Sequence, residues 1–322
     1  MATADLLPGF EDRSCPLGCP LSDQLEIEAG DRLHGLPGRY RVVRCARCGL
    51  LRTNPRPAPA AMGSYYPEDY GPHQMNDEAD ASPAGAATRR ARLLRRLGLE
   101  VRATPPVSPG RLLEIGCASG GWLARMQQAG WSVRGIEFSP RAAERARHRG
   151  FDVQVATIES ATAPPEPVEL VAAWMVLEHL HEPVEALRRV REWVTPEGYL
   201  IASVPDAGAL ERRLFGARWY ALQLPTHLFH YSPATLGRLL AAAGWRVERV
   251  AWQPNCMNLL HSLEYLAEDR GQKRLGSAVR WLRSAPGAAR LRVILGWLLA
   301  RLRQSGRIEV WARPAAHRGG AG

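Results

Sequence analysis

The sequence of 322 residues contains almost no lysine. Of its 42 lysines and arginines only Lys273 is a lysine, and the basic residues exceed the 32 acidic ones by 10. An arginine excess with many alanines, glycines and prolines is in part what a GC-rich genome produces. Net charge informs about partners and solubility rather than about chemistry, so this imbalance does not by itself predict nucleic-acid binding.

Long hydrophobic runs and an export signal are also missing. No apolar stretch reaches the roughly 18 to 20 residues that a membrane-spanning helix needs, and the nearest one, 288–302, is interrupted by three arginines. The first residues contain acids and no apolar run behind a basic start, so they do not make a secretory signal. We therefore expect a cytoplasmic protein whose six cysteines are metal ligands or free thiols. The hydrophobic content of 46% excludes a wholly disordered chain.

Four of the cysteines lie in the first fifty residues as two close pairs, Cys15 with Cys19 and Cys45 with Cys48. Four thiolates in two such pairs are the common ligand set of structural zinc, and they leave no open position for catalysis. Three residues rather than two separate the first pair, and 25 residues lie between the pairs. We predict a zinc-ribbon-like module over 1–57 that binds structural Zn²⁺. The alternative is a ribbon with free thiols that has lost its metal.

The rest of the chain has the pattern of one α/β domain. Leucines at helical spacing among arginines predict an amphipathic helix over 88–99. After it, short apolar runs alternate with helical patterns, in RLLEIG, SVRGIEF, FDVQVA, VELVAAWMV and GYLIASVP, followed by WRVERVAW and RIEVWAR. This alternation predicts a parallel sheet with helices on both faces. The predicted segments are a linker at 58–87, the domain at 88–314 with a helical insertion at about 255–304 before the last strand, and a disordered tail at 315–322.

A glycine-rich turn, EIGCASGG from Glu114 to Gly121, follows the first strand of the predicted sheet and opens a helix. Glycines there let a ligand approach the backbone, and the helix N-terminus offers free N–H groups. The turn lacks the Lys-Ser or Lys-Thr of a phosphate loop and departs from the G-x-G-x-x-G dinucleotide pattern. About twenty residues on, Glu137 ends the second strand, where a carboxylate accepts both ribose hydroxyls of an adenosine. The alternatives are an ordinary turn and a solvated glutamate at the start of the next helix.

These motifs and later ones resemble those of class I S-adenosylmethionine (SAM)-dependent methyltransferases. The resemblance runs in order from about residue 111 to 250, through LLEIGCASGGWLARM, GIEFSP, VATIES, VAAWMVLEHLHEPVEALRRVREWVTPEGYLIASVPD and LPTHLFHYSPATLGRLLAAAGW. It implies a Rossmann-like sheet of seven strands with the last strand antiparallel, and it implies SAM as cofactor. Where the family often has a second glycine this chain has Ala118.

The resemblance also implies which residues contact the cofactor. They are Glu114, Gly116 and Gly120 at the methionine end, Glu137 at the ribose, Phe138, Thr157 and Ile158 at the adenine, and Trp174 and Met175 over the sulfonium. The acidic residue common after the third strand is missing. Each apolar member is alternatively a core residue.

Methyl transfer requires alignment of the acceptor with the methyl group, and removal of a proton when the acceptor is a hydroxyl or an amine. Histidine suits that role at neutral pH. His179, in LEHLHEP after the fourth strand, and His227, in PTHLFHYS after the fifth, match histidines common in the family. We therefore predict both as catalytic or acceptor-positioning groups. The alternative is that they only fix loops around the site.

A cysteine ribbon ahead of such a domain resembles bacterial enzymes of glycan and natural-product tailoring. This layout implies a small-molecule, sugar or glycan acceptor. One alternative is an RNA methyltransferase, because a ribbon and a basic surface also suit RNA. The other is a non-catalytic, metal-stabilised binding protein on a methyltransferase fold.

Residues 270–307 contain ten basic residues and no acid. One interpretation is an insertion packed against the sheet with solvated arginines. Another is a short apolar helix with basic flanks at 286–303 that makes peripheral contact with an anionic membrane. A third is a set of arginines that bind phosphates of nucleic acid or of a nucleotide-sugar.

Overall fold

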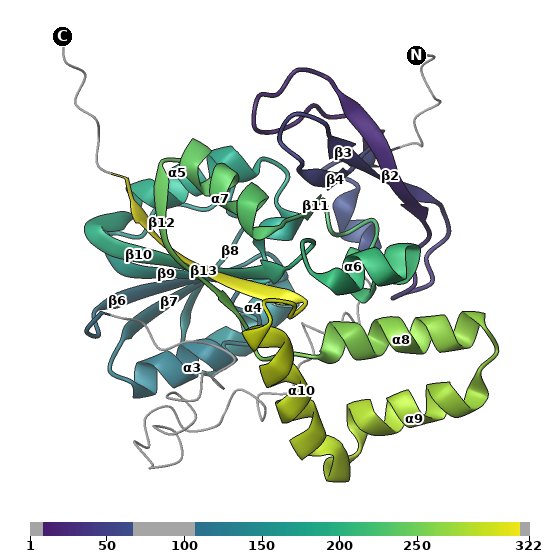
Figure 1. Ribbon diagram of the computed structural model, residues 1–322. Helices are drawn as coiled ribbons and strands as arrows, with labels where there is room; N and C mark the ends of the chain where they lie inside the picture. Colours follow the sequence, from purple (N-terminus) through teal and green to yellow (C-terminus); the bar gives the residue numbers. More distant parts are fainter. Residues whose placement is uncertain (1–8, 67–106, 316–322) are drawn as a thin grey trace.

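The computed structural model describes residues 9–66 and 107–315 (Figure 1). The predicted helix at 88–99, the linker after residue 66 and the tail after residue 315 lie outside these residues. The large domain is built on one seven-stranded sheet. Its strands are β6 (Arg111–Ile115), β7 (Ser132–Glu137), β8 (Asp152–Val155), β9 (Val168–Trp174), β10 (Val194–Pro205), β12 (Trp245–Trp252) and β13 (Arg307–Pro314).

The order of the strands confirms the predicted fold class. It runs β12-β13-β10-β9-β6-β7-β8. The strands from β10 to β8 pair in parallel, whereas β13 pairs antiparallel with both β10 and β12. The chain adds β7 and β8 on one side of β6 and then β9 and β10 on the other side. Because these strands are parallel, the carboxyl ends of β6, β7 and β9 lie at one edge. In open sheets of this kind ligands bind at that edge.

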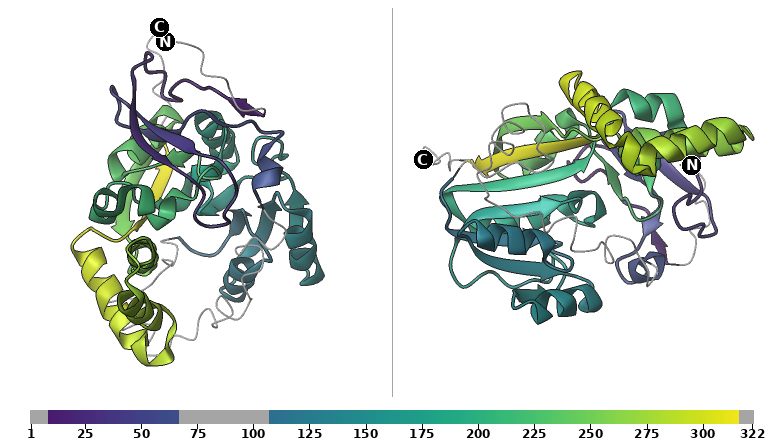
Figure 2. Two further views of the ribbon diagram at one scale, coloured as in Figure 1. Left: turned by 90° about the vertical axis from the view of Figure 1, so that its right-hand side faces the viewer. Right: turned by 90° about the horizontal axis from the view of Figure 1, so that it is seen from below.

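Helices cover both faces of the sheet (Figures 1 and 2). On one face lie α3 (Gly121–Gln128) and α4 (Pro140–His148), and on the other α5 (Pro183–Glu192) and α7 (Pro233–Ala242). Side chains alternate between the faces along a strand, so Leu112 joins the core under α3 and α4 while Leu113 joins the core under α5 and α7. Local signals set the helix starts: Ser232 and the side chain of Thr235 form a capping box at α7.

The N-terminal part is tied to this domain through a shared sheet. It contains β1 (Phe10–Glu11), β2 (Asp23–Ala29), β3 (Tyr40–Cys45), β4 (Leu51–Thr53), β5 (Arg56–Pro57) and the 3-10 turn η1 (Met62–Tyr65). A second sheet has the order β11-β4-β3-β2, and its edge strand β11 (Phe229–His230) belongs to the large domain. Arg52 pairs with Phe229 and Leu51 with His230. The cysteine-bearing part is therefore built onto the loop that carries His227.

The predicted insertion is helical, as expected. It consists of α8 (Met257–Asp269), α9 (Lys273–Ser284) and α10 (Ala289–Arg301), between β12 and β13. These helices extend away from the sheet (Figures 1 and 2). Within residues 9–66 and 107–315, none of the helices combines the length and apolar character that crossing a membrane requires.

Candidate active site

The glycine turn after β6 is closely packed and requires glycine at two positions. Gly116 and Gly120 have φ angles of +71° and +81°, a region that glycine reaches without strain. A Cβ on Gly116 would lie 2.7 Å from Cγ2 of Val176, so a larger residue does not fit. The N–H groups of Gly116 and Cys117 both donate to the carbonyl of Ile136, 2.8 and 3.2 Å away. The turn is thereby held against the end of β7.

Glu137 is a buried carboxylate at this edge, with 3% of its surface exposed. Its Oε2 accepts from the N–H of Ala118 and its Oε1 from the N–H of Ser139, each at 2.9 Å. Burial raises the pKa of Glu137, and the two N–H groups oppose that rise. Because Ser139 caps α4 with its own side chain, Glu137 is not a solvated helix cap. Lone pairs remain on both oxygens for further donors, such as ribose hydroxyls.

The other predicted cofactor residues have contrasting environments. Glu114 is buried, whereas Phe138 is 44% exposed at the edge of the sheet. Thr157 is exposed and lies 3.2 Å from the hydroxyl of Ser160, while Ile158 is buried in the core. The N–H of Ala156, just before them, donates to the carbonyl of Glu137 at 3.1 Å. The turn after β8 is therefore adjacent to the end of β7.

The end of β9 lies at the same edge. Trp174 is buried, and its ring packs edge-on against that of Trp122 at a centroid distance of 5.3 Å. Met175 has a φ of +58° and donates its N–H to the carbonyl of Ser203 at 2.9 Å. Trp174 is thus a core residue as well as a predicted cofactor contact, and its part in binding stays a prediction.

The two predicted catalytic histidines are brought together. His179 ends the 3-10 turn η2 (Leu177–His179) after β9, and His227 precedes β11; their rings lie 4.7 Å apart and nearly perpendicular. Burial lowers the pKa of His179 to about 4 and that of His227 well below its ordinary value. Both imidazoles are therefore neutral at pH 7, with a lone pair on one ring nitrogen.

Two residues of this site were not among the predicted ones. Tyr66 places its hydroxyl 2.9 Å from Nδ1 of His179 and its ring 5.3 Å from that of Phe138. Glu178 is fully buried beside His179, and burial raises its pKa to about 8. Glu178 is visible in the LEHLHEP motif, but nothing in the sequence indicates its burial. Tyr66 lies in a segment predicted as linker, which carries no signal for a site residue.

The four N-terminal cysteines form one cluster. Their sulfur atoms all lie within 4.8 Å of one another, and those of Cys15 and Cys48 are 3.6 Å apart. Four sulfurs around one zinc at Zn–S bonds of about 2.3 Å lie about 3.8 Å from each other. The donor set and its spacing therefore fit a tetrahedral metal. Cys117 and Cys256 are buried elsewhere, as expected.

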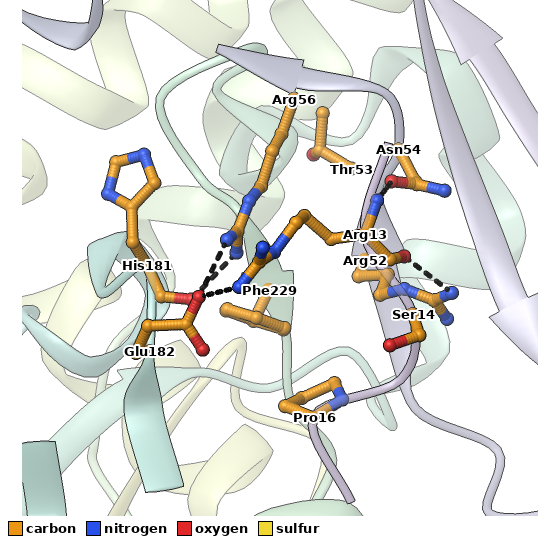
Figure 3. Close-up of a pocket in the computed structure, with 10 residues that line it drawn as sticks. All are labelled: Arg13, Ser14, Pro16, Arg52, Thr53, Asn54, Arg56, His181, Glu182 and Phe229. Carbon is orange, nitrogen blue, oxygen red and sulfur yellow. Dashed lines mark hydrogen bonds and ion pairs between the residues drawn. The ribbon is translucent and has the colours of Figure 1, made fainter. Parts of the chain in front are cut away.

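A cleft between the N-terminal part and the loop after η2 is held by ion pairs (Figure 3). Arg13 and Arg56 both bond the carboxylate of Glu182, and Arg56 also pairs with Glu11 at 2.8 Å. Nη1 of Arg56 donates to the carbonyl of His181 at 2.7 Å. Because these guanidinium groups already have acidic partners, we interpret the cleft as the joint between the two parts rather than as an anion site.

Comparison with known proteins agrees with this geometry. Residues 86–250 match a family described as "Methyltransferase domain". The chain therefore belongs to the class I SAM-dependent methyltransferases.

Curated relatives include "Ubiquinone biosynthesis O-methyltransferase" of Xanthomonas euvesicatoria, 30% identical over 44% of this chain and 64% of that one. The enzyme of the same name from Azorhizobium caulinodans is 28% identical over 49% of this chain and 68% of that one. The chain thus covers 64% of the length of the first relative and 68% of the length of the second.

Solved structures with a similar fold include a SAM-dependent methyltransferase from Mesorhizobium loti, at 18% identity and a TM-score of 0.43 over 69% of this chain and 96% of that one. Another is a putative methyltransferase of Haloferax volcanii in complex with the Trm112 activator, at 14% identity and a TM-score of 0.48 over 71% of this chain and 94% of that one.

Proposed function

We propose that this protein transfers a methyl group from SAM to an oxygen atom of a small-molecule acceptor. The observation that carries the proposal is the unit formed by the Gly116 turn and the buried carboxylate of Glu137, with His179 in the turn η2 that follows β9. Relatives named as O-methyltransferases favour oxygen over nitrogen or carbon.

The residues at the sheet edge suit the parts of SAM. Glu137 would accept the ribose hydroxyls, the exposed ring of Phe138 would cover the adenine, and the glycine turn at Gly116 would receive the methionine end. When bound, SAM supplies an electrophilic methyl group on its sulfonium. The task of the protein is then to align an acceptor oxygen with that methyl group and to exclude water.

His179 and His227 supply the remaining chemistry. Both rings are neutral at pH 7, so a nitrogen lone pair is available to take the proton of an acceptor hydroxyl or to orient that hydroxyl. His227 is held by the bond from its Nδ1 to the carbonyl of Ala221, at 2.9 Å. We assign proton acceptance to His179, in the turn η2 after β9, and positioning to His227.

The experiment has two stages. Calorimetry of the full chain with SAM is expected to show one binding site. If SAM did not bind, the result would favour a non-catalytic binding protein. A panel of sugars, nucleotide-sugars, glycans and phenols is then tested for methyl transfer. The cysteine module favours sugar or glycan acceptors, and the curated relatives favour phenolic ones. Turnover on RNA alone, with steep salt dependence of binding, would contradict a small-molecule acceptor.

We also propose that the basic insertion makes peripheral contact with an anionic membrane. Along α10 and the residue that caps its end, an apolar stripe faces solvent. Its members Leu291, Ile294, Leu298 and Leu302 are 50%, 55%, 45% and 68% exposed. These residues recur at helical spacing and are flanked by Arg290 and Arg301. An apolar helix face with basic flanks is typical of helices that lie in a membrane interface. Such contact would bring the enzyme to a lipid-linked acceptor.

A further inference from the structure

We propose that Glu178, His179 and His227 form a binding site for one divalent transition-metal ion beside the acceptor position. The proposal rests on the proposed function, since it names how that site would hold an acceptor oxygen. It concerns different residues from the cysteine cluster, and binding of the ion can be measured without SAM or acceptor.

The three side chains converge in the interior. One potential ligand atom of each lies within 4.8 Å of the other two. Glu178 is 0% exposed and His227 is 2% exposed. Two imidazoles and one carboxylate are a common ligand set for zinc and for other divalent metals of the first transition row, and they leave coordination positions open.

Each of the two histidines has the kind of hydrogen bond that orients metal-binding histidines. Nδ1 of His227 lies 2.9 Å from the carbonyl oxygen of Ala221, and Nδ1 of His179 lies 3.0 Å from that of Thr226. A carbonyl oxygen only accepts, so each Nδ1 carries the proton and each Nε2 keeps a lone pair. Metal-binding histidines typically donate their second ring N–H to such a carbonyl, which fixes the ring and its tautomer.

Glu178 supplies the independent observation. Among the residues that the structure describes, neither oxygen of its carboxyl group has a hydrogen-bond partner, although the residue is fully buried. The positive charge of Arg307 acts on the carboxylate but donates no hydrogen bond to it. Burial keeps the carboxyl group of Glu178 protonated at pH 7, and a buried polar group without partners destabilises the folded protein. A bound cation would displace that proton and give both oxygens a partner. The backbone holds the residue in place, because the N–H of Leu228 donates to the carbonyl of Glu178 at 2.8 Å.

The site is next to the predicted cofactor site. Val176, two residues before Glu178, is the residue that a Cβ on Gly116 would strike. A metal ion held there would take an acceptor hydroxyl at an open position and lower the pKa of that hydroxyl. His179 and His227 would then hold the acceptor through the ion instead of taking its proton themselves.

In the test, Mn²⁺ is titrated into the full chain after its cysteines have been loaded with zinc. Electron paramagnetic resonance measures the Mn²⁺ that remains free. Mn²⁺ prefers oxygen and imidazole ligands over thiolates, so the cysteine cluster does not compete. We expect one Mn²⁺ per chain, and affinity weakened at least about tenfold in Glu178→Gln and in His227→Gln. His181→Gln is the matched control and is expected to bind as the wild type does.

Thermal unfolding establishes that each variant folds, and His227→Asn replaces any variant that does not. The proposal is overturned if the wild type binds neither Mn²⁺ nor Co²⁺ beyond the cysteine cluster, or if the folded variants bind as tightly as the wild type. Calorimetry with SAM separates the two proposals. Metal binding without SAM binding would contradict the proposed function alone, and SAM binding with turnover in the absence of metal binding would contradict the metal site alone.

Discussion

The hydroxyl of Tyr66 lies 2.9 Å from Nδ1 of His179. Tyr66 directly follows the turn η1 of the N-terminal part, and His179 ends the turn after β9. Since Thr226 accepts from the same Nδ1, Tyr66 is a second acceptor for that N–H group. The N-terminal part therefore contributes to the orientation of a predicted catalytic histidine, in addition to any role of its cysteines.

Removal of this hydroxyl is expected to slow turnover. In Tyr66→Phe the ring contact with Phe138 remains, but His179 loses one hydrogen-bond partner. We expect kcat to fall about tenfold, with the KM for SAM unchanged. Steady-state kinetics with an active acceptor measure this. Tyr65→Phe is the control, because the ring of Tyr65 packs on Phe10. Equal kcat values for the two variants would contradict a positioning role of Tyr66.

Loss of charge at Glu137 is expected to weaken SAM binding. Glutamine has the shape of glutamate, but its NH₂ group would face the N–H of Ala118 or of Ser139, both of which donate to Glu137. We expect the Kd for SAM to rise by about tenfold or more, which corresponds to about 1.4 kcal/mol. Calorimetry of Glu137→Gln measures the change, with Glu144→Gln on the exposed face of α4 as the control. An unchanged Kd would remove Glu137 from the cofactor site.

The cysteine cluster is expected to hold one zinc ion per chain. Elemental analysis of purified protein measures it, and Cys45→Ser should release the metal, because loss of one of four thiolate ligands breaks a closed site. We also expect lower stability of the β4–β11 contact, seen as faster hydrogen exchange at Phe229. Cys256→Ser, at a buried cysteine far from the cluster in sequence, should retain the zinc. Metal-free wild-type protein with a stable fold would contradict the prediction.

The protein is expected to sediment together with anionic vesicles and not with neutral vesicles. The apolar stripe of α10 would enter the interface while its arginines meet the headgroups, so added salt should weaken binding. The double variant Ile294→Asp and Leu298→Asp should abolish co-sedimentation. Leu25→Asp, at a residue 61% exposed on β2, is the matched control. Equal binding of the double variant and the control would exclude α10 as the contact, and dimerisation of the wild type in solution would identify a second copy as its partner.

Titration of Glu211 is expected to contribute to the pH dependence of the free energy of unfolding. It is buried and accepts from Nε1 of Trp219 at 2.8 Å. Burial raises its pKa from 4.5 to about 7. Between these values the folded protein holds a proton that the unfolded chain releases, so this contribution to stability is complete below pH 4.5 and is lost as the pH rises through 7.

Glu211→Gln does not titrate and should lack this component. The free energy of unfolding of the wild type should therefore fall relative to that of the variant as the pH rises from 4.5 to about 7. Denaturant unfolding across this range measures the difference, and Glu268→Gln on the exposed end of α8 serves as the control. A constant difference between variant and wild type would show that Glu211 does not titrate as proposed.

Much of the fold follows from local pattern. The runs at β6, β9 and the second half of β10 are mostly apolar, because both faces of a central strand are buried. The cysteine pairs are equally local, because close spacing brings thiolates together before any long-range contact forms. The position of Glu137 at the end of a strand also follows, since strand ends in a parallel sheet meet at one edge.

What the sequence by itself determined is thus the order of the elements, the two cysteine pairs and the residues at the carboxyl edge of the sheet. Only the tertiary structure decided which distant residues share the site. Tyr66 meets His179 across 113 positions in the chain, and β4 pairs with β11 from the opposite side of the domain boundary that we predicted. The carboxyl group of Glu178 likewise has no hydrogen-bond partner among the residues of 9–66 and 107–315. Periodicity reports which face of an element is buried, but contacts between distant segments depend on packing of the whole chain, and no local pattern encodes them.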